Sequence, residues 1–80
     1  MANLGMGDLK EILVRRVGVP EDKFVADPGT TFEGLGVDSL GVTELMLAIE
    51  QDFGVHIPET DSVKLTTLGA VLAYTNDRLK

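Results

Sequence analysis

One serine in this sequence has surroundings that favour chemistry on a hydroxyl group. Ser39 follows a glycine-containing loop and, together with Asp38, opens a segment with helical periodicity. Asp38 is the expected N-cap, which places Ser39 at the first helical position. The positive end of the helix dipole and the free backbone N–H groups favour a phosphate there. Ser39 is therefore the candidate reactive residue, either as a nucleophilic catalyst or as the acceptor of a phosphate-linked group.

Catalysis by Ser39 would require a base and an acid that orients the base. The only histidine is His56, which follows the predicted helix that Ser39 begins. About 20 Å of helix, at about 1.5 Å per residue, would separate the two side chains. The sequence Gly-Val-Asp-Ser-Leu superficially resembles the motif of Gly-Asp-Ser-Leu hydrolases, but their C-terminal Asp-x-x-His is absent. We therefore expect no catalytic residue, and we interpret His56 as a surface or loop residue.

Length and composition exclude several other classes of function. Eighty residues, of which 44% are hydrophobic, have room for one modest core, so a single domain over residues 1–80 is expected. The absence of cysteine excludes disulfides, thiol catalysis and zinc–thiolate sites. No calcium-binding or nucleotide-binding motif occurs, so no metal site is predicted. No signal peptide or membrane-length apolar run is apparent, and a cytoplasmic monomer is expected.

Charge is segregated along the chain. The net charge is −6, and eight carboxylates but no lysine or arginine lie between Phe24 and Val63. An acidic surface repels nucleic acid and anionic membranes and attracts basic protein surfaces. We therefore expect no nucleic-acid partner and no membrane partner. Acidity also keeps a small protein in solution, but its confinement to one segment favours a protein-binding face.

Apolar spacing predicts three main helices, over about residues 6–17, 38–53 and 67–79. Either Thr66 or Thr67 is the expected cap of the last helix. The second helix is the most regular, and Gly54 is its expected left-handed C′ residue. Its predicted buried stripe comprises Val42, Leu45, Met46, Ile49 and Phe53. With a short fourth helix, these elements make an all-α, small four-helix bundle.

A long connection, over about residues 18–37, separates the first two helices. A turn at Asp27-Pro28-Gly29 interrupts it, and a loop of this length needs its own side chains to hold it in place. The expected anchors are Phe24, Val25, Phe32 and Leu35. The short helix is predicted around residues 61–65, with Val63 and Leu65 facing the core.

The outward face of the second helix carries leucines among carboxylates. At about 100° per residue, Leu40 and Leu47 fall close together, with Glu44 beside them. Single exposed leucines are common and by themselves indicate nothing. Their position next to Ser39, however, favours a protein-docking face.

A longer frame surrounds the Asp-Ser pair. Its segments are Leu35-Gly36-Val37-Asp38-Ser39-Leu40, Glu44-Leu45, Ile49-Glu50, Phe53-Gly54-Val55-His56-Ile57-Pro58 and Thr66-Thr67-Leu68. This frame covers about residues 32–74 and resembles the acyl carrier protein family, while the first helix agrees in pattern only. The resemblance implies a bundle of the acyl carrier type in which Ser39 bears a covalent 4′-phosphopantetheine arm.

The resemblance also implies the partners of this arm. A phosphopantetheinyl transferase would move it from coenzyme A to Ser39 with Mg²⁺, and its thiol would hold acyl or polyketide intermediates as thioesters. The chain itself would be a non-catalytic carrier for ketosynthase, acyltransferase and tailoring enzymes with basic docking surfaces. By analogy, the docking face comprises Asp38, Leu40, Thr43, Glu44, Leu47 and Glu50. Family members can also shelter the acyl chain between the second and third helices, where the candidate lining is Leu45, Met46, Val63 and Leu68.

Gly41 departs from the family pattern. Carriers of primary bacterial fatty acid synthesis commonly have Asp directly after Asp-Ser-Leu, and glycine there costs up to about 1 kcal/mol of helix stability. This departure favours a discrete carrier of the polyketide-synthase type. Two alternatives stay open, namely a peptidyl or aminoacyl carrier of a nonribosomal-peptide-type pathway and an unmodified helical interaction module.

Overall fold

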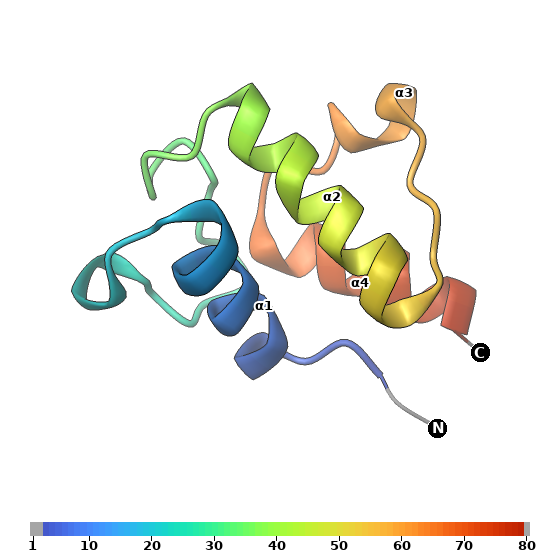
Figure 1. The fold of residues 1–80 in the computed structure, drawn as a ribbon, viewed down its shortest axis with the longest axis horizontal. Coiled ribbons are helices and arrows are strands. Elements are labelled where there is room, and N and C mark those ends of the chain that lie inside the picture. The colour runs from blue at the N-terminus through green and yellow to red at the C-terminus, as the bar shows by residue number, and fades with distance from the viewer. Residues whose placement is uncertain (1–2, 80) are drawn as a thin grey trace.

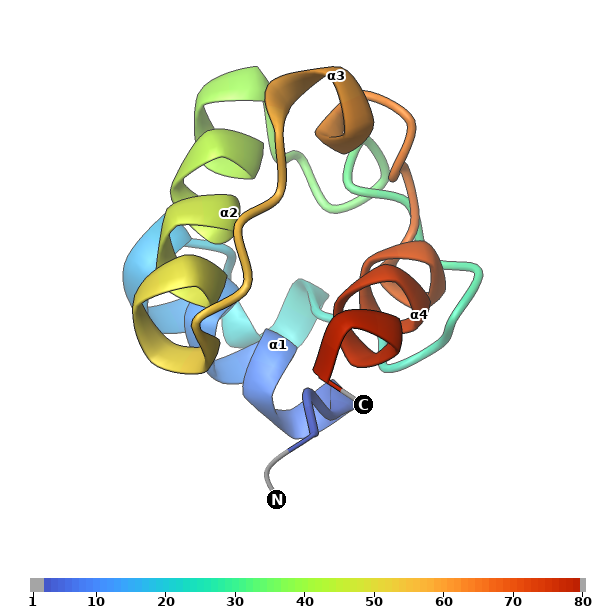
Figure 2. The same ribbon diagram turned by 90° about the vertical axis from the view of Figure 1, so that its right-hand side faces the viewer.

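The computed structural model describes residues 3–79, and its regular elements are helical apart from one isolated bridge. The elements are α1 (Met6–Ile12), a π-helical turn (Leu13–Val17), a 3-10 turn (Glu21–Lys23), α2 (Ser39–Phe53), α3 (Glu59–Ser62) and α4 (Leu68–Leu79). Figure 1 shows α2 running across the molecule. Figure 2 shows α1, α2 and α4 on three sides of a common core, with α3 at one end between α2 and α4. The predicted all-α bundle, with three main helices and one short one, is confirmed.

The first helix has the predicted extent, but its last turn is wider than an α-helix. Near its start, the Gly5 N–H donates to Asp8 Oδ2 at 2.9 Å, and this carboxylate also suits the positive end of the helix dipole. The helix ends at Gly18, which has a left-handed φ of 100°. The N–H groups of Gly18 and Val19 both donate to the Leu13 carbonyl, at 2.9 and 2.8 Å. These bonds satisfy an otherwise free carbonyl of the last turn.

The second helix follows its prediction at both ends. Asp38 is the N-cap, because its Oδ1 accepts the Gly41 N–H at 2.9 Å, and Ser39 is the first helical residue. Gly54 ends the helix with a left-handed φ of 71°, and its N–H donates to the Glu50 carbonyl at 2.9 Å. These caps fix the position of the Ser39 backbone relative to the core.

The buried face of α2 differs in part from the predicted stripe. Its buried residues are Gly41, Leu45, Met46, Ala48 and Ile49. Val42 and Phe53 are only half-buried and pack against the edge of the core. The rest of the core comes from α1, α4 and the connections, mainly through Leu9, Leu13, Val19, Phe32, Leu35, Val55, Ile57, Leu68 and Val71.

The long connection is fastened to the start of α4 by a short antiparallel pairing. Three backbone hydrogen bonds of 2.9–3.1 Å join residues 28–32 to residues 66–69, and we call these two stretches the seam. The bonds run from the N–H groups of Phe32, Leu68 and Gly69 to the carbonyls of Thr66, Thr30 and Pro28 respectively. Thr31 and Thr67 form an isolated bridge within it. The seam explains how so long a loop stays in one conformation.

Three of the four predicted loop anchors point inward. Phe32 and Leu35 are buried, and Phe24 is half-buried against the core. The prediction for Val25 is wrong, because its side chain is 56% exposed. The Thr30 hydroxyl donates to the Val25 carbonyl at 3.0 Å, which closes a tight turn and leaves the Val25 side chain outside it.

The fourth helix begins where predicted. Thr67 caps it, because its hydroxyl oxygen accepts the Ala70 N–H at 3.1 Å. The next residue but one, Gly69, lies so close to the loop that a Cβ there would come within 2.9 Å of the Pro28 carbonyl oxygen. Only glycine therefore allows the seam to close. Among the described residues, no helix is both long and apolar enough to cross a membrane.

Candidate functional site

Ser39 has an exposed side chain at the first position of α2. Its hydroxyl makes no hydrogen bond to another described residue. The side-chain cap of α2 comes from Asp38 and not from Ser39. The Thr43 hydroxyl donates to the Ser39 carbonyl at 3.0 Å, which adds a contact between the first and second turns. The backbone N–H groups of Ser39 and Leu40 precede the first intrahelical bonds of α2. The predicted acceptor is thus an uncommitted hydroxyl on a firmly held helix.

His56 lies beyond the other end of α2, in the connection to α3. The length of α2 is about 20 Å, which excludes a direct contact with Ser39. The His56 side chain is exposed, and its Nδ1 lies 2.9 Å from Glu50 Oε1. The prediction that His56 is a loop residue is confirmed. The described residues also contain no group of three or more side chains that could hold a metal ion.

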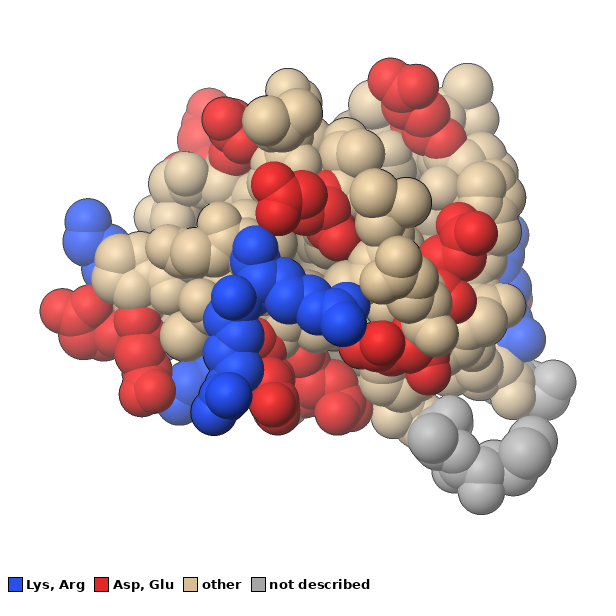
Figure 3. Space-filling view, in the orientation of Figure 1, with Lys and Arg blue, Asp and Glu red and all other residues tan. Residues whose placement is uncertain are grey.

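The predicted docking residues all lie on the surface. Leu40 and Leu47 are 69% and 52% exposed, on the face of α2 that points away from the core. Asp38, Thr43, Glu44 and Glu50 are exposed as well. Figure 3 shows carboxylates over α2 and α3, and a compact group of basic side chains beside them over α1.

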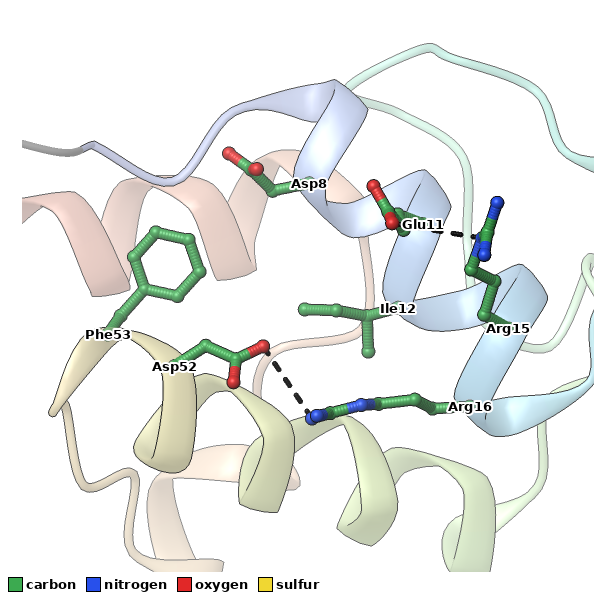
Figure 4. Close-up of a pocket in the computed structure, with 7 residues that line it drawn as sticks. All are labelled: Asp8, Glu11, Ile12, Arg15, Arg16, Asp52 and Phe53. Atoms are coloured by element: carbon green, nitrogen blue, oxygen red, sulfur yellow. Dashed lines mark ion pairs between the residues drawn. The ribbon is translucent and has the colours of Figure 1, made fainter.

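The separation of charge in the sequence is less complete in space. Arg16 Nη1 lies 3.6 Å from Asp52 Oδ2, so one carboxylate of the acidic segment has a cationic partner from the end of the first helix. Figure 4 shows this pair at a recess between α1 and the end of α2, with Ile12 and Phe53 also lining it. This recess is at the opposite end of α2 from Ser39. It therefore does not belong to the site around the serine.

A cleft of about 560 Å³ opens directly beside Ser39, between α2 and α3. Ser39 and Val42 line one side of it, Val63 and Leu65 line the other, and Phe32 contributes from the loop. Of the four lining residues predicted from the resemblance, Val63 lines this cleft. Met46 lines a smaller recess of about 190 Å³ that also lies between α2 and α3. Leu45 and Leu68 are buried and line neither of the two.

Hydroxyl groups are frequent in this cleft, and two of them besides that of Ser39 can still donate a hydrogen bond. Thr43 and Ser62 already donate to backbone carbonyls at 3.0 and 2.9 Å. Thr31 Oγ1 accepts the Gly34 N–H at 2.9 Å, so its own proton is free. The Thr66 hydroxyl makes no hydrogen bond to another described residue. The cleft can therefore offer hydrogen bonds to oxygen atoms of a bound chain.

The third helix forms one wall of the cleft and contains no buried residue. It begins two residues earlier than predicted, because Pro58 starts its first turn. The prediction that Val63 faces the core is also wrong, since Val63 directly follows the helix and is 67% exposed. Val63 is therefore a third large apolar side chain on the exposed surface near Ser39.

A side-chain hydrogen bond joins α3 to α4. The Tyr74 hydroxyl donates to Asp61 Oδ2 at 2.6 Å, and the Arg78 guanidinium stacks 3.5 Å from the centre of the tyrosine ring. The hydrogen bond to Asp61 raises the pKa of Tyr74 above its ordinary value of 10.0, with a smaller contribution from burial, while Arg78 opposes this shift. Since α3 has no buried residue, this bond is a principal contact that holds the cleft wall.

Removing the Tyr74 hydroxyl should loosen this wall. We expect Tyr74→Phe to speed amide hydrogen exchange in α3 by about threefold or more while leaving α2 unchanged. The folded pKa of Tyr74 is raised, so the bond contributes fully below pH 10.0 and is lost as the pH rises through the folded pKa. Melting curves of the variant and the wild type should therefore differ at pH 8 and converge in stronger base. Equal α3 exchange rates and equal melting at pH 8 would contradict this role.

Comparison with known proteins identifies the family. A family model described as a phosphopantetheine attachment site matches residues 7–75. The anthracycline acyl carrier proteins DauA of Streptomyces sp. (strain C5) and DpsG of Streptomyces peucetius are each 40% identical over 81 residues, covering 100% of this chain and 96% of the relative. This chain belongs to the acyl carrier protein family. As a member of this family, it has a covalent 4′-phosphopantetheine and holds acyl intermediates as thioesters.

The family assignment explains why the site has a hydroxyl but no base. Carrier proteins are not catalysts, and they act with a phosphopantetheinyl transferase and with synthase enzymes. An exposed serine without an adjacent histidine suits a protein that is modified by another enzyme. The sequence reasoning missed the position of Thr31 and Thr66 at the cleft and the outward position of Val63, because these residues lie in segments without helical periodicity.

Proposed function

We propose that Ser39 is the residue to which the 4′-phosphopantetheine arm is attached. The observation that carries this proposal is its exposed, unbonded hydroxyl at the start of α2, inside the segment matched by the family. The chain has one other serine, Ser62, whose hydroxyl is engaged with the Glu59 carbonyl at 2.9 Å. Ser62 is less exposed than Ser39, since its side chain is half-buried. It is also the last residue of the short α3, so it lacks the helix N-terminus that Ser39 has.

The reaction at Ser39 would transfer the 4′-phosphopantetheinyl group from coenzyme A to the serine oxygen. Ser39 Oγ attacks the phosphorus next to the pantetheine, an O–P bond forms, and the phosphoanhydride bond of coenzyme A breaks. Adenosine 3′,5′-bisphosphate leaves, and the transferase takes the hydroxyl proton. The resulting phosphodiester lies where the N–H groups of Ser39 and Leu40 and the helix dipole favour an anion. The residues present therefore fit the arm.

We propose a polyketide intermediate as the cargo rather than a saturated fatty acyl chain. Two relatives are described as anthracycline acyl carrier proteins, which favours this class. The free donors of Thr31 and Thr66 in the cleft support it independently, because a poly-β-ketone has carbonyl oxygens that accept hydrogen bonds. A saturated chain has no oxygen atoms along its length to accept these hydrogen bonds.

We further propose that ketosynthase, acyltransferase and tailoring enzymes bind the exposed face of α2 through basic surfaces. Leu40, Leu47 and Val63 would supply the apolar contacts of this docking face, with Glu44 and Asp38 around them. Carboxylates around such a face attract a basic partner surface and speed the encounter of the two proteins, while the resulting complex stays weak and reversible. A carrier that visits several enzymes in turn needs such short-lived complexes.

Intact-mass measurement tests the attachment. The unmodified protein is incubated with a phosphopantetheinyl transferase, coenzyme A and Mg²⁺, and we expect a gain of roughly 340 Da, the mass of the arm itself. A carrier known to be a substrate of the same transferase serves as the positive control. If that control gains the arm and this protein does not, the attachment proposal fails.

Reversing one charge on the docking face tests the electrostatic part of the proposal. Glu44→Lys should raise the KM for a partner ketosynthase by roughly threefold to tenfold, because it places a cation opposite a basic surface. The matched control is Glu21→Lys, which changes the net charge equally but lies in the 3-10 turn outside the docking face. Wild-type turnover should also fall as salt rises. Equal KM values for the two variants would contradict the docking face.

A further inference from the structure

The charged side chains that line the cleft beside Ser39 are both carboxylates. Glu33 contributes from the long connection, and Glu59 contributes from the first position of α3. No lysine, arginine or histidine is among the lining residues. Lys64 follows Val63 in the chain and is exposed, but it does not line the cleft. The cleft therefore offers no cationic side chain with which a bound anion could pair.

The remaining lining of the cleft is suited to neutral groups. Its exposed surface is more apolar than polar, with apolar side chains from Phe32, Val42, Val63 and Leu65. The other polar side chains are hydroxyls, which are neutral and can satisfy a ketone oxygen. Moving a full negative charge out of water against an apolar surface costs far more than moving a ketone, unless a cation pairs with the charge. The lining therefore favours a ketone over a carboxylate.

The attached arm strengthens this preference. The start of α2 is electropositive, but the phosphodiester on Ser39 would already occupy the free N–H groups there. Ser39 itself lines the cleft, so the negative charge of the phosphodiester would lie at the edge of the cleft. An anion inside the cleft would then be repelled by this charge and by the carboxylates of Glu33 and Glu59. The repulsion is strongest where the apolar lining displaces water, because the local dielectric constant is lower there.

We propose that the cleft selects its cargo by charge, so that it admits a neutral β-keto acyl chain and excludes an acyl group that ends in a carboxylate. This inference rests on the proposed attachment at Ser39 and on the proposed polyketide cargo. A neutral chain enters the cleft, where its oxygen atoms meet the hydroxyls of Thr31 and Thr66. An acyl group with a free carboxylate, such as malonyl, stays in water at the end of the arm. The same arm thus stores neutral chains and presents charged groups to partner enzymes.

Two acyl groups of closely similar size test this selection, because malonyl carries a negative charge and acetoacetyl does not. A phosphopantetheinyl transferase attaches each group, together with the arm, from its coenzyme A thioester to the unmodified, ¹⁵N-labelled protein. Intact mass confirms the loading. Relative to the protein with the free arm, acetoacetyl should shift the amide signals of Phe32, Val63 and Leu65, and malonyl should shift them at least about fivefold less. Equal shifts from the two groups would overturn the proposal.

A cation placed in the cleft should admit the carboxylate. Glu33→Lys lies outside the docking face on α2, and it should bring the malonyl shifts to within about twofold of the acetoacetyl shifts. The matched control is Glu21→Lys, which changes the net charge equally but does not line the cleft, so its malonyl shifts should equal those of wild type. Glu59→Lys repeats the test from α3 if Glu33→Lys folds poorly. Malonyl shifts that stay small in both cleft variants, or that rise equally in the control, would overturn the proposal.

The mass measurement separates the failure of this inference from the failure of the proposals on which it rests. A protein that gains no acyl arm, while a known carrier does, would overturn the attachment at Ser39 and this inference with it. A loaded protein whose cleft amides respond to neither acyl group would overturn storage in the cleft, and therefore selection by the cleft as well. Equal responses to both groups would overturn the selection by charge and leave the attachment and the storage standing.

Discussion

Replacing Ser39 by alanine is expected to abolish loading of the arm, with a fall of more than about 1,000-fold in the transfer rate. The chain has no cysteine and only one other serine, so no equivalent acceptor is available. The fold should survive, because the Ser39 side chain is exposed and Asp38 provides the cap. We therefore expect the free energy of unfolding to change by less than about 0.5 kcal/mol. Intact-mass analysis and thermal melting measure the two effects separately.

The chain supplies its own control for this experiment. Ser62→Ala removes the other serine hydroxyl, which also lies at the cleft, and it should gain the arm at the wild-type rate. Loading of Ser39→Ala together with no loading of Ser62→Ala would move the attachment to α3. Unfolding of Ser39→Ala would instead indicate that the serine has a structural role at the start of α2.

The second large effect is expected at Gly69, on the seam. In Gly69→Ala, the new Cβ would lie 2.9 Å from the Pro28 carbonyl oxygen and 2.9 Å from Pro28 Cβ. Because the carbonyl is backbone, relief requires the loop to separate from α4, which also lengthens the seam hydrogen bonds. We expect a net loss of about 2 kcal/mol, since such overpacking costs more than the roughly 1 kcal/mol that alanine gains in helix propensity. The melting temperature should fall by roughly 10 °C.

A glycine in the first helix provides the matched control. Gly7 lies within α1, and a Cβ there would meet nothing within 4 Å. Gly7→Ala should therefore stabilise the protein by about 0.5–1 kcal/mol, through helix propensity alone. Denaturant titrations of the two variants give the comparison. A Gly69→Ala protein as stable as Gly7→Ala would show that the loop moves away from α4 at little cost.

The sequence predicted the features that depend on local rules. The N-cap at Asp38 and the left-handed Gly54 appear in the structure as predicted, and Thr67 is the cap of the last helix, one of the two candidates. Each follows from the chemistry of one residue and its nearest neighbours, so no knowledge of the tertiary structure is required. The buried positions Leu45 and Ile49 were also predicted, because the periodicity of α2 is regular.

Two wrongly predicted side chains lie where periodicity is absent. Val25 and Val63 are both apolar, yet both point outward, because the direction of a side chain in a turn depends on the path of the backbone. The close packing around Gly41 was not predicted for a related reason. A Cβ there would lie 3.0 Å from Val17 Cγ1, which is distant in the sequence, and 2.7 Å from Val37 Cγ1 in the preceding loop. Helix propensity reports only a local cost.

The candidate site likewise has one part that local sequence features predicted and one part that they did not. Ser39 was found from its motif and from the helix that it begins, which are local features. The full lining of the cleft was not predicted, because the cleft is bounded by segments that only the fold brings together. Thr31 and Thr66 illustrate this, since they belong to the two stretches of the seam and reach the cleft only through its pairing.

The position of Ser39 at the cleft has a consequence for the carried intermediate. Ser39 is itself part of the cleft lining, so an arm attached there would begin at the cleft. The arm would turn into the cleft or away from it by rotation about its own bonds, while the capped helix α2 stays in place. Storage and delivery of the cargo would then share one fixed anchor.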